Sequence, residues 1–154
     1  EKPINFKFNP GYSCMLSLDI EELKNEKRPF SFVSTNDEPY LEFIVKKYHG
    51  GVTEKIHKLN IGEHLILSDI FRSHRYRGKG VFIAGGTGIT PFLSLFTHES
   101  FTEYINPMIY LGFCSKEFNI YEQELNAVRL RGNSVELRVP KIFYRDTDGV
   151  IDKP

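Results

Sequence analysis

Short apolar stretches, several of them alternating with polar residues, characterise the first half of the chain. Alternation with a period of two is typical of half-buried β-strands, because successive side chains of a strand point to opposite faces. Turn residues such as Asn9-Pro10-Gly11 separate the stretches. Several short strands joined by turns predict an antiparallel barrel or sandwich. The expected strands are residues 6–8, 14–20, 30–35, 40–48 and 64–70.

A glycine pair and a threonine predict a short helix between the last two of these strands. Gly50-Gly51 breaks the preceding strand, Thr53 suits the N-cap position, and the helix is expected over 54–59. Val52 and Ile56 are spaced for a hydrophobic staple across this cap. A glycine turn that leads into a helix start is also a geometry that binds phosphate. A turn with a threonine cap and no ligand is the simpler interpretation of this motif alone.

The pattern changes near residue 78, where continuous apolar runs begin to alternate with helical stretches. Strands that alternate with helices predict a parallel α/β sheet, so we expect two domains, 1–77 and 78–154. Three strands and two helices are fewer than a complete doubly wound sheet contains, so the chain is expected to represent only part of that domain. The expected strands are 81–84, 108–112 and 135–139, and the expected helices are 91–98 and 119–131.

A glycine-rich loop follows the first of these buried strands. The glycines of Gly85-Gly86-Thr87-Gly88 let the backbone turn sharply and approach a ligand closely. Thr90 suits the N-cap of the next helix, and Pro91 suits its first position, where a missing N–H is no loss. Unpaired N–H groups at a helix start attract a phosphate, so a ligand-binding loop is favoured. The spacing is G-x-G-x-x-P, which differs from the G-x-G-x-x-G dinucleotide fingerprint.

The run Arg28-Pro29-Phe30-Ser31 combines three groups that recognise ligands. Arg28 offers a planar fork for a phosphate or carboxylate, Phe30 offers a ring face, and Ser31 offers a hydroxyl. A strand with one exposed arginine is the simpler interpretation of this motif by itself.

Composition and charge exclude several classes of protein. Lys and Arg number 20 and Asp and Glu number 20, so no broad electrostatic argument favours nucleic acid or an anionic membrane. No apolar run approaches the length that spans a membrane and no signal peptide is recognisable, so a cytoplasmic protein is expected. Cys14 and Cys114 are expected to be buried small hydrophobic residues. The five His show no metal-ligand spacing, and no metal is expected.

Four motifs taken in order resemble the ferredoxin–NADP reductase family. They are R-P-F-S at 28–31, L-E-F-I-V-K-K-Y at 41–48, G-G-V-T at 50–53 and A-G-G-T-G-I-T-P at 84–91. Supporting matches at 8–12, 112–116 and 121–125 extend the likeness over nearly the whole chain. Each motif is modest alone, but the four in this order are specific.

This resemblance implies an antiparallel Greek-key flavin-binding barrel, 1–77, followed by an incomplete parallel Rossmann-like α/β domain that binds NAD(P), 78–154. The implied activity is that of a flavin-dependent oxidoreductase that passes electrons from NADH or NADPH to a protein or small-molecule acceptor such as ferredoxin or flavodoxin. FAD is the implied cofactor, with FMN as an alternative.

The resemblance also implies roles for individual residues. Arg28 would pair with a flavin phosphate and Pro29 would also contact the cofactor. Phe30 would stack on the isoalloxazine, and Ser31 would act catalytically near flavin N5. The remaining flavin contacts would come from Val45, Lys46, Tyr48, Gly50, Gly51, Val52 and Thr53. The nicotinamide nucleotide would be held by Gly85, Gly86, Thr87, Gly88, Thr90 and Pro91, with Ser115, Tyr121 and Lys141 near a 2′-phosphate.

The chain also departs from the family pattern. It lacks the first barrel strand and the C-G-P segment near the nicotinamide, so a flavin-carrying electron-transfer or regulatory subunit without hydride transfer is the alternative. A reductase module fused to an oxygenase is a third interpretation. Arg72, Arg75, Arg77 and Lys79 form either a solvated linker or a dock for an acidic electron-transfer protein.

Overall fold

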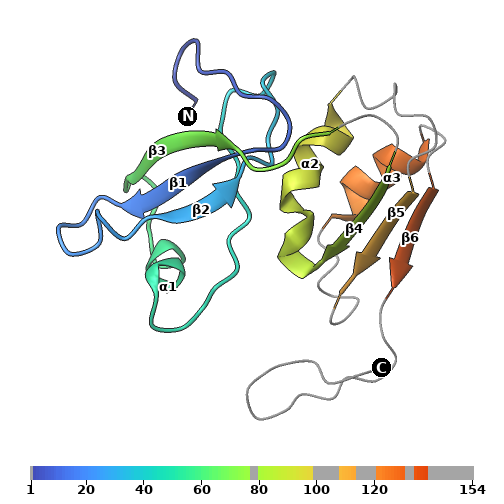
Figure 1. Ribbon diagram of the computed structural model, residues 1–154. Helices are drawn as coiled ribbons and strands as arrows, with labels where there is room; N and C mark the ends of the chain where they lie inside the picture. The colour runs from blue at the N-terminus through green and yellow to red at the C-terminus, as the bar shows by residue number, and fades with distance from the viewer. Residues whose placement is uncertain (1, 77–79, 99–107, 114–120, 131–133, 139–154) are drawn as a thin grey trace. The chain divides into compact units, whose positions relative to one another are not determined.

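The computed structural model describes residues 2–76, 80–98, 108–113, 121–130 and 134–138. The chain divides into two compact units (Figure 1). The first unit comprises Glu1–Tyr76 and Thr90–His98, and the second comprises Arg77–Ile89 and Glu99–Pro154.

The first unit is built on a three-stranded antiparallel sheet. Its strands are β1 (Tyr12–Leu18), β2 (Arg28–Ser31) and β3 (Leu65–Arg72), in the order β2-β1-β3. The β1–β2 register places Ser13 opposite Ser31. The β1–β3 register shifts between Ser13 and Met15, and Asp69 in β3 has a φ of 50°. A β-bulge accounts for both observations, because its extra residue bends the strand and Asp tolerates positive φ.

The core of this unit lies on one face of β1. Cys14 and Leu16 of β1 pack with Phe8 and Phe32, and all four are at most 5% exposed. The rings of Phe8 and Phe32 stack with centroids 4.2 Å apart. Burial raises the pKa of the Cys14 thiol to about 12. The prediction that Cys14 is a buried small hydrophobic residue is confirmed.

Two predicted strands of the first unit are absent, because side chains replace a backbone ladder there. At 6–8, the Asn36 side-chain amide donates to the Phe8 carbonyl and accepts from the Phe8 N–H. At 40–48, Glu42 N donates to Ser34 Oγ, and the Glu42 carbonyl accepts one bond from Val33 N. The strand predictions for 6–8 and 40–48 are therefore wrong. The alternating apolar residues still mark positions that contact the core, since Leu41 and Phe43 pack against it.

The helix α1 (Val52–Ile56) starts earlier than the sequence predicts. Its N-cap is Gly51, with no side-chain capping bond. Thr53 lies inside the helix, and its Oγ1 accepts a hydrogen bond from Tyr48 N at 3.0 Å. The prediction that Thr53 is the N-cap is wrong, because this hydroxyl binds the preceding segment instead of the helix start.

The helix α2 (Thr90–Thr97) belongs to the first unit, although a division at residue 77 places it in the second. Gly11 N donates to the buried Ser94 Oγ of α2 at 3.4 Å, and the Tyr76 hydroxyl donates to the Pro91 carbonyl. Phe92 adds edge-to-face ring contacts with Tyr76 and His74. These contacts attach the helix to the turn before β1 and to the segment after β3.

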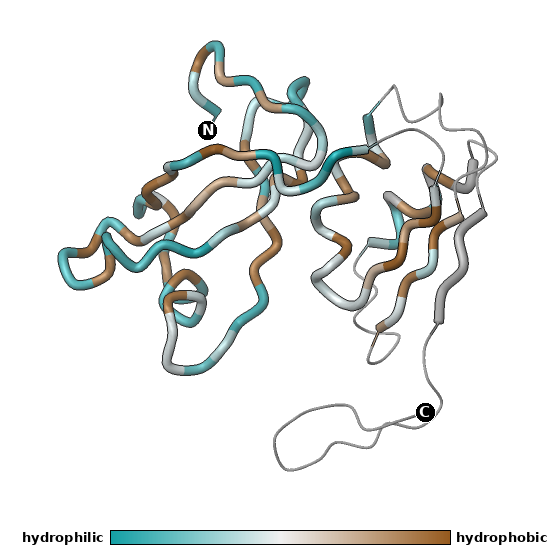
Figure 2. Tube along the Cα trace, viewed as in Figure 1, coloured by the Kyte–Doolittle hydropathy of each residue, from teal (hydrophilic) through white to brown (hydrophobic). Residues whose placement is uncertain are grey.

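The second unit contains a parallel sheet with the order β4-β5-β6. Its strands are β4 (Val81–Gly85), β5 (Met108–Gly112) and β6 (Ser134–Arg138). The 3-10 helix η1 (Gly86–Ile89) follows β4, and α3 (Glu122–Leu130) lies between β5 and β6 in sequence. Figure 2 shows the continuous hydrophobic colour of β4, as expected for a parallel strand. The predicted fold class, an antiparallel unit followed by a parallel α/β unit, is confirmed.

Burial in this sheet is uneven between its two faces. Ile109 and Leu111 of β5 are 1% exposed, and α3 contributes the buried Leu125 and Val128. On β4, Ile83 is 74% exposed. No helix in the described ranges is long and apolar enough to cross a membrane.

Candidate functional site

Arg28 lies at the exposed start of β2. Its Nη1 donates to the Lys27 carbonyl at 3.0 Å, and its Nη2 lies 3.5 Å from Glu26 Oε2. The side chains of Arg28 and Glu26 are each 52% exposed. Because exposed ion pairs contribute little, an incoming anion can replace Glu26 as the partner of this guanidinium at small cost.

Phe30 and Pro29 differ in how much surface they offer to a ligand. Phe30 is half-buried, lies opposite Cys14 and packs against the core of the first unit. Pro29 is exposed and lies opposite Met15. The core therefore fixes the Phe30 ring, and only the exposed part of that ring is available to a flat ligand.

Ser31 is the last residue of β2 and heads a chain of hydroxyl groups. Ser31 Oγ lies 3.1 Å from Ser13 Oγ on β1, and Ser13 Oγ donates to Ser73 Oγ at 2.8 Å. Ser73 Oγ donates in turn to the Gly11 carbonyl at 2.8 Å. The His74 Nδ1 lies 3.3 Å from Ser73 Oγ. The half-buried Ser31 hydroxyl is thus held in place by three consecutive hydrogen bonds.

The segment around Val45 and the glycine turn lie next to each other. His57 Nε2 lies 2.7 Å from the Val45 carbonyl, which pins this segment against α1. Tyr48 N donates to Thr53 Oγ1 at 3.0 Å. Lys46 Nζ lies 5.3 Å from the centre of the Tyr48 ring. These contacts place a cation, an aromatic ring and a helix start next to one another.

The Gly50-Gly51 turn leaves space for an approaching group. Gly50 has a φ of 76°, a conformation that favours glycine. Gly51 has a φ of −117°, which any residue adopts, and a Cβ added there would meet nothing within 4 Å. Neither backbone geometry nor crowding explains a glycine at 51. The adjacent Val52 is 2% exposed and anchors the turn.

A carboxylate already occupies part of this helix start. Glu54 Oε2 accepts from Gly50 N at 2.8 Å, and Glu54 Oε1 lies 3.1 Å from Lys58 Nζ. The Gly50 N–H, and secondarily Lys58, hold the pKa of Glu54 well below its usual range, at about 2. An anion that binds Gly50 N has to displace Glu54. The N–H groups of Val52 and Thr53 lie in the first turn, where helices lack intrahelical acceptors.

In the second unit, the helical backbone after β4 begins at Gly86 as the 3-10 helix η1, which runs directly into α2. Thr90 and Pro91 therefore lie after a helical turn, and the prediction that Thr90 is the N-cap is wrong. The physical reason is that Gly86, with a φ of 51°, already turns the chain into η1. The helix start that can face an anion is the segment Gly85–Gly88.

Glycines in this loop have open space where a side chain would be. A Cβ added at Gly85, Gly86 or Gly88 meets nothing within 4 Å. At Gly11, by contrast, an added Cβ would lie 2.7 Å from Tyr76 Cε2. Gly11 is therefore required by packing, whereas Gly85 and Gly88 are not. The exposed loop is anchored by Ile89, which is 0% exposed.

Tyr121 is placed in the core of the second unit. It is 3% exposed and stacks with Phe113 at a centroid distance of 6.3 Å. Its ring therefore contributes to packing. The predicted contacts of Ser115 and Lys141 lie outside the described residues, as do Cys114, Arg77 and Lys79.

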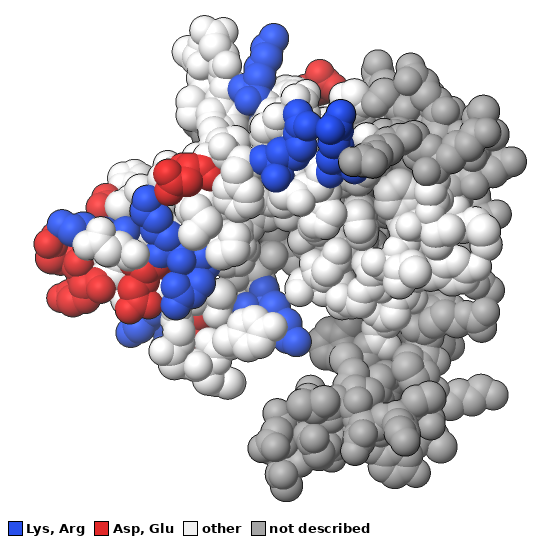
Figure 3. All heavy atoms as spheres, viewed as in Figure 1, with Lys and Arg blue, Asp and Glu red and all other residues white. Residues whose placement is uncertain are grey.

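The basic segment that begins at the end of β3 is represented by Arg72 and Arg75 in the described ranges. The Arg72 guanidinium lies 5.7 Å from the Tyr12 ring centre, and Nη2 lies 3.5 Å from the Tyr12 hydroxyl. This contact is the main cause that lowers the pKa of Tyr12. Figure 3 shows Lys and Arg interspersed with Asp and Glu over the first unit. Arg72 thus packs against β1, and the docking interpretation stays a prediction.

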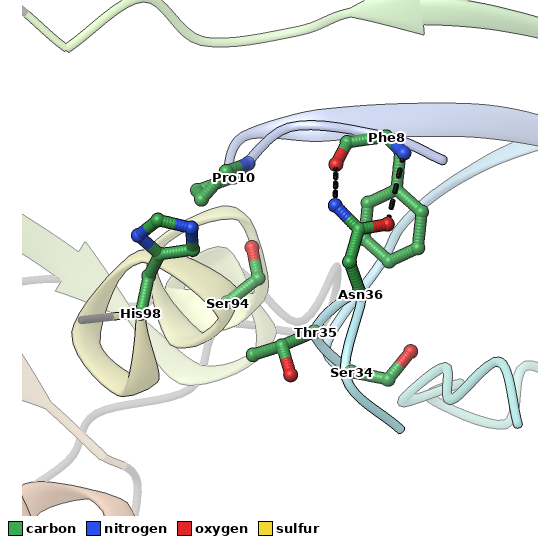
Figure 4. Close-up of a pocket in the computed structure, with 7 residues that line it drawn as sticks. All are labelled: Phe8, Pro10, Ser34, Thr35, Asn36, Ser94 and His98. Carbon is green, nitrogen blue, oxygen red and sulfur yellow. Dashed lines mark hydrogen bonds between the residues drawn. The ribbon is translucent and has the colours of Figure 1, made fainter. Parts of the chain in front are cut away.

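A shallow pocket lies elsewhere in the first unit (Figure 4). It encloses almost no volume, whereas small-molecule sites enclose roughly 300–1,000 Å³. The Asn36 amide in it is bonded on both sides to the Phe8 backbone, and Ser94 Oγ accepts from Gly11 N. Its polar groups therefore hold the fold together. The lining residues are Phe8, Pro10, Ser34, Thr35, Asn36, Ser94 and His98.

Comparison with known proteins identifies relatives of this chain. No model of a known protein family matches. The reductase component of propane 2-monooxygenase from Rhodococcus jostii (strain RHA1) is 32% identical over 108 residues, 66% of this chain and 28% of the relative. Ferredoxin–NADP reductase A from Sorangium cellulosum is 27% identical over 152 residues, 91% of this chain and 53% of the relative.

The chain is homologous to ferredoxin–NADP reductases and related reductase components. A ferredoxin–NADP reductase from Neisseria gonorrhoeae, solved with bound FAD and NADP, shares its fold with a TM-score of 0.71 at 18% identity, over 90% of this chain and 58% of that one. The family resemblance found in the four motifs is confirmed. This chain spans about half the length, or less, of the relatives that it matches.

Several residues that shape this ferredoxin–NADP reductase homologue were not found from the sequence. Ser13 and Ser73 order the Ser31 hydroxyl, Glu54 binds the glycine turn, and His57 pins the Val45 carbonyl. Ser and Glu are common surface residues, and nothing in their spacing marks them. The i,i+4 spacing of Glu54 and Lys58 within the predicted helix 54–59 is the one available signal.

Proposed function

We propose that this chain is the flavin- and nucleotide-binding part of an NAD(P)H-dependent flavin oxidoreductase that delivers electrons to a partner protein. The observation that carries the proposal is the open space at Gly51 in the first unit and at Gly85 and Gly88 in the second. Internal packing requires none of these glycines. Gly80 has the same open space, so what distinguishes Gly51, Gly85 and Gly88 is their place beside helix starts within the ordered motifs, where a phosphate can approach the backbone. Homology to ferredoxin–NADP reductases and to an oxygenase reductase component supports the choice of ligands.

The residues of the first unit would hold FAD. Arg28 would bind a phosphate with its exposed fork, and the N–H groups of Val52 and Thr53 would donate to the same phosphates. The exposed part of Phe30 would contact the ring system. Ser31 would lie at N5, with its hydroxyl ordered by Ser13. When bound, the flavin supplies the redox chemistry, taking a hydride from NAD(P)H and releasing electrons to the acceptor.

The Gly85–Gly88 loop of the second unit would bind the nucleotide pyrophosphate. Backbone N–H groups at the start of η1 point out of a helix terminus, where the partial positive charge favours an anion. The open space at Gly85 and Gly88 would let the phosphates reach those groups. The choice between NADH and NADPH involves positions outside the described residues.

Two glycine substitutions test the two sites separately. Gly51→Ala should weaken FAD binding, and Gly88→Ala should weaken NAD(P)H binding, each by about tenfold, the value of one good hydrogen bond or close contact. Gly80→Ala is the matched control, because Gly80 also has open space and an ordinary φ but lies outside both motifs. Binding is measured by flavin fluorescence quenching and by titration with NADH and NADPH.

Purified protein should take up FAD or FMN, lose the oxidised flavin absorbance on addition of NADPH or NADH, and reduce ferricyanide. Protein that takes up neither flavin contradicts the proposal. Protein that holds flavin but does not oxidise either nucleotide is instead a flavin-carrying electron-transfer subunit.

A further inference from the structure

The hydroxyl chain that ends at Ser31 has a defined direction. A hydroxyl group has one proton to donate and can accept additional bonds. The proton of Ser73 is directed at the Gly11 carbonyl, which can only accept, at 2.8 Å. Ser73 therefore accepts from Ser13, whose Oγ lies 2.8 Å away. The only hydroxyl proton of Ser13 is donated to Ser73. In the 3.1 Å contact between Ser13 Oγ and Ser31 Oγ, Ser31 is therefore the donor.

The terminal carbonyl of the chain is firmly held. The Gly11 carbonyl also accepts from Ser73 N at 3.1 Å and from His74 N at 3.0 Å, so it cannot turn away. Gly11 itself is fixed by its φ of 81° and by the adjacent Tyr76 ring. Ser13 is 3% exposed, which shields its own hydroxyl from competing water. The orientation of the Ser31 hydroxyl is therefore imposed from a backbone group at the turn before β1.

From this geometry we propose that Ser13 and Ser73 are positioning residues that make Ser31 a hydrogen-bond acceptor toward its ligand, so that the site favours reduced over oxidised flavin. The inference rests on the proposed function, in which Ser31 faces flavin N5. Reduced flavin carries a proton on N5 that Ser31 can accept with the hydroxyl chain intact. Oxidised flavin has a lone pair on N5, and Ser31 can donate to it only by breaking its bond to Ser13.

The consequence is an elevated midpoint potential that depends on Ser13 and Ser73. Ser13→Ala removes the acceptor of the Ser31 proton and leaves that proton free for oxidised N5. Ser73→Ala removes the acceptor of the Ser13 proton, so Ser13 can donate to Ser31 and reverse the chain. Both variants should bind oxidised flavin more tightly relative to reduced flavin, by about tenfold for one redirected hydrogen bond. For a two-electron couple this corresponds to a potential about 30 mV more negative.

The measurement is an anaerobic redox titration of each flavin-loaded variant of the full chain against an indicator dye, together with the dissociation constant of oxidised FAD. Ser73 is exposed, so its variant should fold even if the buried Ser13→Ala variant does not. Ser13→Thr, which restores a hydroxyl, should restore the potential. Ser17→Ala is the matched control: Ser17 lies on the same strand, is 1% exposed and takes no part in the chain.

Each outcome has one meaning. A more negative potential in both Ser13→Ala and Ser73→Ala, with Ser17→Ala unchanged, supports the proposal. An unchanged or more positive potential in Ser73→Ala in a protein that binds flavin overturns the hydroxyl chain while leaving the proposed function intact. A wild-type protein that takes up no flavin refutes the proposed function itself.

Discussion

Two serines of β1 should respond in opposite directions to the same substitution. Ser13 and Ser17 lie four residues apart on one strand and are 3% and 1% exposed. Ser13 Oγ has hydrogen-bond partners at 3.1 and 2.8 Å. Ser17 Oγ, in the part of the chain that the structure describes, is buried without a partner. Replacement of each by alanine removes one hydroxyl and leaves Cβ in place.

The magnitudes follow from these contacts. A buried hydroxyl without a partner costs about 1–3 kcal/mol, and its removal forfeits a few dispersion contacts of about 0.1–0.2 kcal/mol each. Ser17→Ala should therefore raise the free energy of unfolding by about 1 kcal/mol. Ser13→Ala loses two hydrogen bonds of about 0.5–1.5 kcal/mol each and should lower the free energy of unfolding by about 1–3 kcal/mol. The two variants should therefore differ by about 2–4 kcal/mol in free energy of unfolding.

Urea denaturation followed by far-UV circular dichroism measures the change, and amide hydrogen exchange of the β1 segment assigns it to the first unit. Ser17→Ala at least as destabilising as Ser13→Ala would show that Ser17 has a hydrogen-bond partner and would refute the reasoning. A neutral Ser13→Ala would show that the hydroxyl chain adds nothing to stability.

Two further predictions concern Gly11 and Glu54. Gly11→Ala should destabilise the protein by at least about 2 kcal/mol, because alanine is strained at a φ of 81° and its Cβ would lie 2.7 Å from Tyr76 Cε2; a thermal melt that matches that of Gly80→Ala would contradict this. The pKa of Glu54 is lowered from 4.5 to about 2, so its stabilising effect is complete above pH 4.5 and is lost as the pH falls through 2. Wild type should therefore lose stability more steeply than Glu54→Gln over this interval in urea titrations at a series of pH values, and parallel curves would show that Glu54 is not bound to Gly50.

Some features of this protein follow from the order of its residues alone. Alternation located β1 and β3, continuous apolar runs located β4 and β5, and four motifs in order identified the relatives of the chain. These predictions succeed because the spacing of apolar residues indicates which side chains are buried, and glycines indicate where the backbone turns. Both signals are local in the sequence. Although 6–8 and 40–48 do not form the predicted strands, their apolar side chains Phe6, Phe8, Leu41 and Phe43 do pack in or against the core.

Other features depend on segments that meet only in the folded chain. Asn36 bonds Phe8 across 28 positions, and Ser13 bonds Ser73 across 60. Gly11 N donates a hydrogen bond to Ser94 Oγ across 83 positions, and this bond attaches α2 to the first unit. The sequence around Asn36, whose side chain bonds the Phe8 backbone in place of a neighbouring strand, looks like that around any polar surface residue. The same holds for Ser13, whose hydroxyl fixes the Ser31 hydroxyl. Because hydrogen bonds are short and directional, only the tertiary structure decides which of these groups are partners and which way their protons point.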